Sequence, residues 1–600
     1  MGVAGSGKTT IGQMVADAIG AVFTDADSLH SPANVAKMAA GHPLTDADRW
    51  PWLASVRQAL RTTGDVVVAC SALTRRYRDL LRHAGDVRFV YLALDEATAR
   101  DRALHREGHY MGADMVASQF DTLEAPEPDE TDIVTVDGTL PADEVLAEAV
   151  RRLATTTPGT AAVPLIADGG VDRAITADEL ASHMTTLTRD RVAATGARRV
   201  LLVPPDHTRL HSRSGPITVM LKRELEARGC TVGVLPALGT HVAMTDADVT
   251  AMFGDEIGAS ELLVHDWRNG LKVLGEIGGE EVGVVTAGRY AEAIPVAVDA
   301  QLFEGWDLVI SIGQVVPHEV IGMANFTKNI VIGLGGAPTI HRSHFVGAVA
   351  GMEQIMGRTT SAVRDVVDAA FDRFVDPLVP VLWVLTVVED VDGAMVQRGL
   401  FVGVGGTMQS GGAAFRAAAD LARRTNVDIV GAPLDRVVCW LDPAEMRSTW
   451  LGNKAVYRTR MAIADGGELV VLAPGVTRFG EDPAIDALIR RHGYRGTPAT
   501  LDAVRGDPEL AANLGAAAHL VHGSSEGRFR IVWCTDPTTG LTREEVESVG
   551  YEWRDLRDEL DRLGVGGDTT SGRRTDRAGG TFQFIANPAM GLWSTAERLA

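Results

Sequence analysis

The chain has 600 residues, which is enough for several domains, and 46% of them are hydrophobic, which is ample for their cores. Its 57 Lys and Arg stand against 79 Asp and Glu, a net charge of −22 with no long basic cluster, which argues against nucleic acid or an anionic membrane as partner. No apolar run reaches membrane-spanning length, no signal peptide is recognisable, and the four scattered cysteines form no Cys-x-x-Cys pair, so we expect a protein of the reducing cytoplasm.

A phosphate-binding loop opens the chain. Gly2-Val-Ala-Gly5-Ser-Gly7-Lys8-Thr9 fits the pattern G-x-x-x-x-G-K-[ST], and the following run TIGQMVADAIG has the apolar spacing of a helix. In such a loop the glycines let backbone N–H groups face the phosphates, Lys8 neutralises the transferred group, and Thr9 offers a hydroxyl to magnesium. ATP and Mg²⁺ are therefore the cofactors expected for this part of the chain.

The strand that normally precedes such a loop has about five apolar residues, and the sequence has no such run before Gly2. We expect the true start codon to lie upstream, so that the central strand of the kinase sheet is missing from the sequence. The alternative is a kinase domain that is weakened.

Three further segments extend the pattern: FTDADSLHSPANVAKMAAGHPLTDADRWPWL, VVVACSALTRRYRDLLR and REGHYMGADMVASQFDTLEAPEPDE. Together with the loop they resemble gluconokinase over residues 1 to about 153, which implies an α/β phosphate-loop kinase with three layers around a parallel sheet. Asp25 and Asp27 end a strand-like run, AVFTDAD. One of them, Asp27 by preference, is expected to orient the acceptor hydroxyl of a sugar acid or to serve the metal.

An anionic polyol needs cations and hydrogen-bond donors together. Candidates for holding it are His30, Arg49, Arg75 and Arg78, and two arginines just before GHYM, Arg102 and Arg106, look like lid residues that close over the phosphates. The alternative for those two is an ordinary solvated helix face.

A linker follows the kinase-like part. The helical run ADEVLAEAVRRL gives way to ATTTPGTAAVP, whose Thr, Pro and Gly content cannot sustain a helix. We place the kinase domain at residues 1–153 and the linker at 154–163. Beyond it ARRVLLVPP, ITVMLKRELEARG and CTVGVLPALG alternate strand, helix and strand, which predicts βαβ architecture. A late run, GVGGDTTSGRRTDRAGG, is expected to be a flexible loop.

The most informative segment is PHEVIGMANFTKNIVIGLGGAPTIHRSH, where His318, Lys328 and His344 stand 10 and then 16 residues apart. The runs DLVISIGQVV before it and NIVIGLGG within it read as strands, and His241 lies upstream where a strand passes into a loop. Inverting a carbon that bears a hydroxyl next to a carboxylate is difficult by C–H proton removal. A hydride acceptor and two bases on opposite faces can do it through a 2-keto acid, and histidine suits both bases.

This set resembles the nickel-pincer lactate racemase family of 2-hydroxyacid racemases and epimerases. The resemblance implies that His241 and His318 are the two bases. It also implies a nickel ion held by one carbon and two sulfurs of a modified pyridinium mononucleotide, which is tethered through a thioamide to Lys328 and ligated by His344. The family has two α/β lobes with the active site between them. We place the catalytic and cofactor lobe at 164–408, the carboxy-terminal lobe at 409–600, and a hinge around Gly403–Gly412.

Further matches come with departures. Asp206 and Arg209 in PPDHTR fit the family's Asp-x-x-Arg segment, where an arginine would bind a phosphate or carboxylate. Lys454 matches a lysine close to the substrate, but the glutamine expected three residues earlier is Leu451, and the usual Gly-Gly-Ala before the cofactor lysine is replaced by residues 325–327, Asn-Phe-Thr. These departures indicate a reshaped pocket, so lactate is not the expected substrate.

The two halves explain each other if their substrates coincide. A 2-epimerase of this family would interconvert D-mannonate and D-gluconate, and ATP-driven phosphorylation would pull the product toward 6-phosphogluconate. One alternative is a racemase of another 2-hydroxy acid; another is a non-catalytic module that binds the cofactor or a sugar acid, against which the presence of both His241 and His318 argues. The expected partners are sugar acids, ATP and the enzymes that build the nickel cofactor, and homo-oligomer formation is left open.

Overall fold

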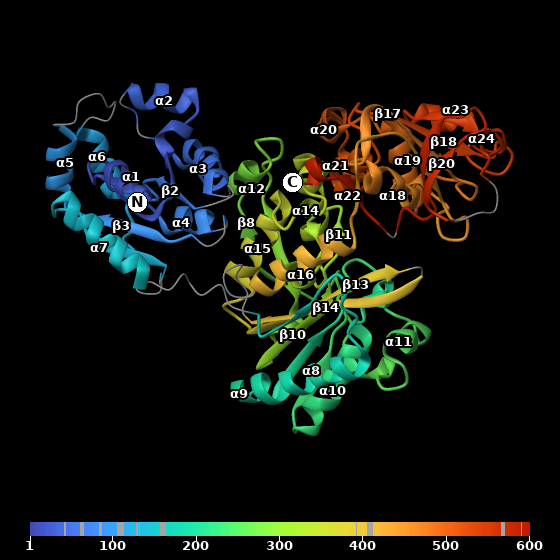
Figure 1. The fold of residues 1–600 in the computed structure, drawn as a ribbon, viewed down its shortest axis with the longest axis horizontal. Helices are drawn as coiled ribbons and strands as arrows, with labels where there is room; N and C mark the ends of the chain where they lie inside the picture. Colours follow the sequence, from blue (N-terminus) through green and yellow to red (C-terminus); the bar gives the residue numbers. More distant parts are fainter. Residues whose placement is uncertain are drawn as a thin grey trace. The chain divides into compact units, whose positions relative to one another are not determined.

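The computed structural model divides into two compact units, one built mainly from residues 1–163 and the other mainly from residues 164–600 (Figure 1). It describes every residue except 41, 43, 61–64, 83, 85–86, 105–112, 128–129, 131, 156–163, 392, 405–411, 566–569, 590 and 600. Both units are α/β structures, as the sequence predicts. Within these described ranges, no helix combines the length and the hydropathy needed to cross a membrane.

The first unit packs helices against short parallel strands. Its elements are α1 (Lys8–Ile19), β1 (Val22–Asp25), η1 (Ala26–Leu29), α2 (Pro32–Ala39), α3 (Asp46–Leu60), β2 (Val66–Ala69), α4 (Arg75–Arg82), β3 (Phe89–Ala93), α5 (Glu96–Leu104), α6 (Ala113–Thr122), β4 (Ile133–Asp137) and α7 (Ala142–Thr155). β1 pairs with β2 and β3 with β4, both in parallel. The helix α7 extends two residues into the predicted linker, and residues 156–163 lie outside the described residues.

The parallel strands of this unit form two separate pairs, and the first residues of the chain lie between them. The Met1 amino group donates to the Val90 carbonyl at 2.5 Å, and the Met1 carbonyl accepts from the Leu92 N–H at 3.1 Å. The Gly2 N–H donates to the Ser71 carbonyl, just after β2, at 3.3 Å. The phosphate-binding loop therefore starts between β2 and β3.

The first lobe of the second unit is a six-stranded sheet covered by helices. Its strand order is β5-β14-β13-β10-β6-β7, in which β7, β6, β10 and β13 are parallel and β14 and β5 are antiparallel to their neighbours. The elements are β5 (Ile166–Gly169), α8 (Ala177–Leu187), η2 (Thr188–Val192), α9 (Ala193–Thr195), β6 (Arg199–Val203), η3 (His207–Ser212), α10 (Ser214–Ala227), β7 (Thr231–Val234), α11 (Asp246–Phe253), η4 (Ala259–Glu261), β8 (Leu271–Ile277), α12 (Gly279–Val285), β9 (Ile294–Asp299), η5 (Ala300–Phe303), β10 (Leu308–Gln314), β11 (Pro317–His318), β12 (Gly322–Met323), α13 (Thr327–Val331), α14 (Ala337–Ala350), η6 (Met352–Gln354), α15 (Ala362–Phe374), β13 (Val381–Val391) and β14 (Ala394–Val404). The βαβ unit expected from the sequence is β6-α10-β7.

The second lobe repeats the same principle with a sheet in the order β19-β18-β17-β16-β21-β20, parallel except for β20. The elements are α16 (Gly412–Thr425), β15 (Asp428–Val430), β16 (Leu434–Trp440), α17 (Thr449–Gly452), α18 (Lys454–Thr459), β17 (Ile463–Leu472), α19 (Pro483–His492), α20 (Thr497–Gly506), α21 (Pro508–Ala512), α22 (Leu514–His522), β18 (Arg530–Thr535), α23 (Arg543–Ser548), β19 (Glu552–Asp555), α24 (Leu556–Leu563), β20 (Gly572–Thr575), β21 (Thr581–Ile585), β22 (Trp593–Thr595) and α25 (Ala596–Leu599). α16 follows the predicted lobe boundary at residue 408 yet packs on the first lobe, where Phe415 stacks on Phe326 at 5.1 Å. The expected hinge falls largely on 405–411, outside the described residues.

Two local expectations are wrong. The run NIVIGLGG does not form a strand, because its first residues belong to the helix α13. A short buried apolar run carries no periodicity that separates helix from strand. The Gly- and Arg-rich run after residue 563 is not wholly a loop, because Gly572–Thr575 pairs with β21 as the edge strand β20. Here the sheet edge imposes a strand on a sequence of low strand propensity.

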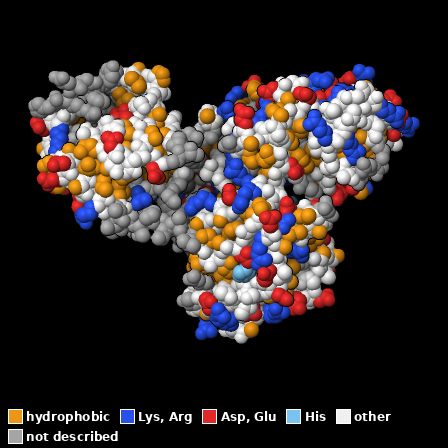
Figure 2. Space-filling model, viewed as in Figure 1, with side chains coloured by type: hydrophobic (Ala, Val, Ile, Leu, Met, Phe, Trp, Pro, Cys, Tyr) orange, Lys and Arg blue, Asp and Glu red, His pale blue; other side chains and the backbone are white. Residues whose placement is uncertain are grey.

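Acidic and basic side chains are mixed over the surface of the second unit. On the face drawn in Figure 2, blue Lys and Arg alternate with red Asp and Glu rather than separating into a surface of one sign.

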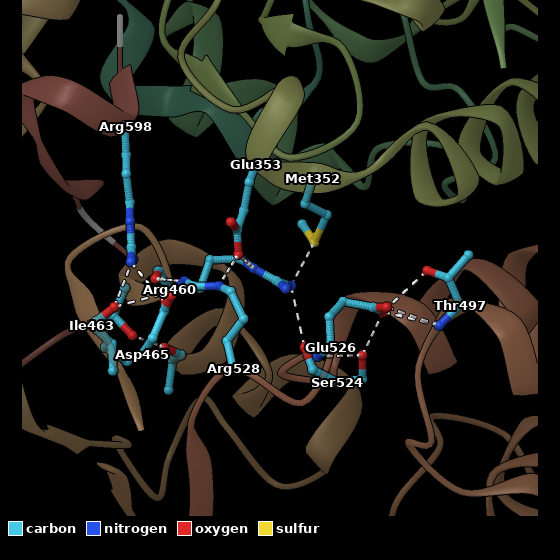
Figure 3. Close-up of polar contacts among 12 residues, drawn as sticks. Met352, Glu353, Arg460, Ile463, Asp465, Thr497, Ser524, Glu526, Arg528 and Arg598 are labelled. Atoms are coloured by element: carbon cyan, nitrogen blue, oxygen red, sulfur yellow. Dashed lines mark hydrogen bonds and ion pairs between the residues drawn. The ribbon is translucent and has the colours of Figure 1, made fainter. Parts of the chain in front are cut away.

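A carboxylate of the first lobe holds two arginines of the second. Glu353 Oε1 accepts from Arg460 Nε at 3.1 Å and from Arg528 Nε at 3.0 Å (Figure 3). Arg460 is only 2% exposed, and its Nη1 also donates to the Ser524 carbonyl at 3.2 Å and contacts Met352 Sδ at 3.6 Å. A buried guanidinium requires such partners, so this contact ties η6 to the end of α18.

Glu353→Ala should destabilise the second unit by about 2–4 kcal/mol, because it leaves the buried Arg460 charge without a carboxylate. Differential scanning calorimetry of the full chain measures the loss as a lower melting temperature of that unit. Asp502→Ala is the matched control, since it removes an exposed pair with Arg505 whose side chains are 69% and 78% exposed. Equal shifts for the two variants would contradict the importance of the Glu353 contact.

Candidate active sites

One cavity of about 220 Å³ in the first lobe of the second unit gathers six of the residues selected from the sequence. They come from five separate stretches of the chain: the turn after β6, the loop after β7, and β11, α13 and α14. The six lining residues are Asp206, Arg209, His241, His318, Lys328 and His344.

His241 is paired with a buried carboxylate. Its Nδ1 lies 2.6 Å from Asp206 Oδ2, and the Asp206 side chain is 4% exposed while that of His241 is 56% exposed. Burial opposes ionisation of Asp206, but hydrogen bonds from His241 and Thr208 lower its pKa below the usual value. An ionised Asp206 accepts the Nδ1 proton of His241, which leaves the His241 Nε2 as an acceptor.

His318 has the opposite hydrogen-bonding arrangement to His241, because its Nδ1 accepts a hydrogen bond. It lies in β11, paired with Gly322 of β12, and its Nδ1 accepts from the Val320 N–H at 3.1 Å. Burial lowers the pKa of His318 well below its usual value, only partly offset by Glu319, so the ring is neutral. With Nδ1 accepting, the proton of the neutral ring is on Nε2, and His318 presents a donor where His241 presents an acceptor.

Lys328 follows a strained turn. Asn325 and Phe326 have φ values of +66° and +61°, and Phe326 has ψ −138°, a region in which residues other than glycine cost about 1–3 kcal/mol. Phe326 is fully buried, 4.7 Å from the ring of Trp383, and stacked on Phe415. Burial of this ring offsets the strain, and it fixes the start of α13, whose second residue is Lys328.

A buried arginine of α15 donates hydrogen bonds to the same turn. Arg364 Nη2 donates to the Met323 carbonyl at 2.5 Å, and its Nη1 donates to Thr327 Oγ1 at 3.1 Å and to the Asn325 carbonyl at 3.3 Å. Asp368 accepts from Thr327, and burial raises the pKa of Asp368 to about 6. The backbone on both sides of Phe326 is therefore fixed by side chains of α15.

Lys328 and His344 both carry lone pairs that are available near neutral pH. Burial, reinforced by Arg209, lowers the pKa of Lys328 from 10.5 to about 8. Burial likewise lowers the pKa of His344 to about 4, and its Nδ1 lies 2.7 Å from the Ile340 carbonyl. That bond takes the Nδ1 proton and leaves Nε2 free as a metal ligand. Among the described residues, no three His, Cys, Asp or Glu side chains gather into a metal site.

Lys454 is not one of the residues that line the cavity. It begins α18 of the second lobe and is partly buried, and burial lowers its pKa, opposed by Glu319. Sequence reasoning missed Glu319 and Arg458, which interact electrostatically with Lys454, and His522, which interacts with Glu319. It also missed Gln314, which lines the cavity and whose buried Oε1 has no hydrogen-bond partner among the described residues. No motif marks these four residues.

The phosphate-binding loop of the first unit has the backbone its glycines permit. Gly2, Gly5 and Gly7 have φ values of +148°, +81° and +82°. A Cβ on Gly5 would lie 2.3 Å from the Ala99 carbonyl oxygen, whereas nothing lies within 4 Å of a Cβ on Gly7. The loop is thus packed on one side and open on the other, and Lys8 begins α1 at its end.

A pocket beside this loop brings Lys8 together with Asp27, His30 and Arg49. Asp25 accepts a hydrogen bond from Thr9 Oγ1 at 2.9 Å, so Asp25 orients the Thr9 hydroxyl, while Asp27 lines the pocket. His30 stacks on Trp52 at 4.4 Å, and burial lowers its pKa against the effect of Asp27. Trp52, Ser71 and Gln119 also line the pocket and were missed from the sequence.

The other candidate arginines that the structure describes contact groups outside the residues that line this pocket. Arg78 is 1% exposed and donates from Nε and Nη2 to Glu130 at 2.8 and 2.6 Å, so its guanidinium forms a buried ion pair. Arg75 pairs with Glu127 at 2.9 Å and does not line the pocket. Arg102 donates to the Gly138 carbonyl at 2.7 Å, and Arg106 lies outside the described residues.

Comparison with known proteins addresses the first unit directly. Residues 4–154 match the family model described as shikimate kinase. Over 147 residues the chain is 45% identical to a probable gluconokinase of Schizosaccharomyces pombe, an alignment that covers 23% of this chain and 76% of the relative. The first unit belongs to the gluconokinase family.

The second unit carries a lactate racemase N-terminal domain, whose family model matches residues 172–357. A protein of Thermotoga maritima shares its fold, with a TM-score of 0.57 and 22% identity over 71% of this chain and 99% of that one. The lactate racemase apoprotein of Thermoanaerobacterium thermosaccharolyticum does so with a TM-score of 0.51 and 15% identity over 72% of this chain and 95% of that one. The chain is a fusion of the two kinds of domain.

The amine of Lys328 should react near pH 8, where an ordinary lysine is still protonated, because its lowered pKa exposes the lone pair at lower pH. Reductive methylation at a series of pH values, followed by peptide mass analysis, measures the midpoint. Lys222, whose pKa is raised by Glu226 and Glu261 although burial opposes them, is the internal control. A shared midpoint for the two lysines would refute the distinction.

Proposed function

We propose that the chain is a bifunctional sugar-acid enzyme: a nickel-pincer-dependent C2 epimerase of a 2-hydroxy acid, with D-mannonate and D-gluconate as the preferred pair, and an ATP-dependent gluconokinase. The observation that carries the epimerase is the convergence of two histidines of opposite hydrogen-bonding state, a lysine and a third histidine on one cavity. Membership of the gluconokinase family supports the kinase.

The epimerase needs a proton carrier on each face of the reacting carbon. His241, with Asp206 behind it, accepts the hydroxyl proton of one epimer at Nε2, and Asp206 stabilises the imidazolium that results. His318 is the proton carrier on the other face, where its neutral ring donates a hydrogen bond from Nε2 to the substrate oxygen. For each epimer the ring that has taken up a proton returns it to the keto oxygen or to solvent, so both histidines regain their starting state. Arg209, which lines the same cavity, is suited to bind the substrate carboxylate or the cofactor phosphate.

The side chains fit the proposed cofactor. Lys328 offers an amine of lowered pKa for the covalent tether, and His344 offers Nε2 to the nickel. When bound, the nickel-pincer nucleotide supplies the hydride acceptor and brings the other ligands of the metal itself. Enzymes that build this cofactor are therefore the partners we propose.

The kinase uses the loop and its pocket. Backbone N–H groups of the loop and Lys8 hold the phosphates of ATP, and Thr9, steadied by Asp25, holds magnesium. Asp27 orients the acceptor hydroxyl, while Arg49 and His30 hold the anionic polyol. A shared substrate makes the fusion useful, because phosphoryl transfer from ATP to D-gluconate removes the product of an epimerisation that is itself close to equilibrium.

Two single variants should separate the activities. Lys328→Ala should abolish epimerisation and leave gluconate phosphorylation unchanged, because the tether lies in the second unit. Lys8→Ala should reduce phosphorylation by about a hundredfold or more and leave epimerisation unchanged, because it removes a charge that stabilises the transferred phosphoryl group. Separate assays on nickel-loaded protein measure both; loss of both activities in either folded variant would refute the two-enzyme assignment.

D-mannonate conversion tests the substrate pairing. Nickel-loaded protein should give a mixture of D-mannonate and D-gluconate without ATP, and should accumulate 6-phosphogluconate when ATP and Mg²⁺ are added. His241→Ala and His318→Ala should each stop full inversion, since one face loses its proton carrier. Fast racemisation of lactate with no turnover of either sugar acid would favour the alternative, a racemase of another 2-hydroxy acid.

A further inference from the structure

Glu319 is a partly exposed carboxylate next to His318 in the chain. Its Oε2 lies 3.6 Å from Arg458 Nη2 and 3.8 Å from His318 Nδ1, and both distances are too long for hydrogen bonds. The Glu319 side chain is 25% exposed. It is therefore neither buried in a tight ion pair nor fully solvated.

Two side chains of the second lobe each have a buried nitrogen without a hydrogen-bond partner among the described residues. Arg458 donates from Nη1 to the Pro317 carbonyl at 3.2 Å, but its Nε is buried and has no hydrogen-bond partner among the described residues. His522, at the end of α22, is 7% exposed, and its Nε2 is likewise buried and unpartnered within that part of the chain. Buried polar atoms are costly to leave unpaired, so such atoms indicate a ligand.

Arg458 and His318 lie 3.6 and 3.8 Å from the Glu319 carboxylate, and the same carboxylate interacts electrostatically with Lys454 and His522. Burial lowers the pKa of Lys454 and of His522, and Glu319 opposes that shift. Burial disfavours ionisation of Glu319 itself, yet the charged Arg458 guanidinium helps to hold its pKa well below the usual range. The site thus offers an ionised acceptor beside donors of two kinds.

We propose that Glu319, Arg458 and His522 form a subsite that binds the hydroxyl groups of a polyhydroxy acid beyond its reacting carbon. This inference rests on the proposed epimerase and names what makes it select a sugar acid. An ionised carboxylate accepts hydrogen bonds from hydroxyls and repels a phosphate or a second carboxylate, which favours a polyol over an anionic ligand. Lactate has no hydroxyl beyond C2 and would leave the buried Arg458 Nε and His522 Nε2 unpaired.

The position of the subsite follows from the lobe contact. Arg458 lies two residues before Arg460, the residue that Glu353 holds, and Pro317 and Glu319 flank His318. The same contact that fixes α18 against η6 therefore fixes Arg458 beside the strand that carries the proposed base.

The test compares ligand binding to the full-length apoprotein by isothermal titration calorimetry, with Asp27→Ala in every sample to weaken the kinase site. D-gluconate and D-lactate are the probes. Glu319→Ala and the isosteric Glu319→Gln should each weaken D-gluconate binding about tenfold or more and change D-lactate binding by less than about threefold. Glu304→Ala, which removes an exposed carboxylate of the same lobe, should change neither.

The same variants, loaded with nickel cofactor, should lose the preference for D-gluconate over D-lactate in kcat/KM by a similar factor. Melting temperatures establish that each variant is folded, and Arg458→Gln provides an independent second variant with the same expected loss. If the unsubstituted protein binds and epimerises D-gluconate while Glu319→Gln and Arg458→Gln keep the preference for D-gluconate over D-lactate, the subsite is refuted and the proposed epimerase is not. If the unsubstituted protein turns over no sugar acid, the proposed epimerase of sugar acids fails instead.

Discussion

The contact between Glu353 and the two arginines, Arg460 and Arg528, is the constraint on which the arrangement of the second unit depends. Arg460 is almost wholly buried, so it stabilises the unit only while a carboxylate of the other lobe faces it. Asp465 continues the contact outward, accepting from Arg528 at 2.7 Å and from Arg598 at 2.9 Å (Figure 3). The carboxy-terminal helix is thereby joined to the same network, and α18 is held beside the cavity.

The histidines of this cavity differ through their hydrogen bonds rather than their type. His241 has a carboxylate at Nδ1, His318 has a backbone N–H at the same atom, and His344 has a carbonyl. One ring thus presents a hydrogen-bond acceptor, one a hydrogen-bond donor, and one a nitrogen suited to bind a metal. Burial lowers the pKa of His344, which keeps the ring neutral as metal ligation would require.

The sequence predicts the parts of the site that local chemistry marks. The glycines of the phosphate-binding loop need left-handed backbone, and the spacing of His318, Lys328 and His344 selects one family, so these residues could be found without a structure. The ion pair of Arg78 could not be predicted from the sequence, because only the fold shows that Glu130 lies beside it. The run NIVIGLGG is wrongly predicted as a strand because a short apolar run has no periodicity that distinguishes a strand from a helix. Glu319, Arg458 and His522 could not be selected from the sequence, because only the folded structure shows the Glu319–Arg458 contact between the lobes and the unpaired nitrogens of Arg458 and His522.

The turn at Asn325 and Phe326 determines how rigidly the backbone of Lys328 is held. Glycine would adopt these backbone angles freely, but it would also free the turn to sample many others in the unfolded and folded states. A buried aromatic ring, clamped by Arg364, instead leaves the turn a single conformation. The backbone that carries Lys328 is thus already ordered, so the cofactor attachment proposed above would cost little further backbone entropy.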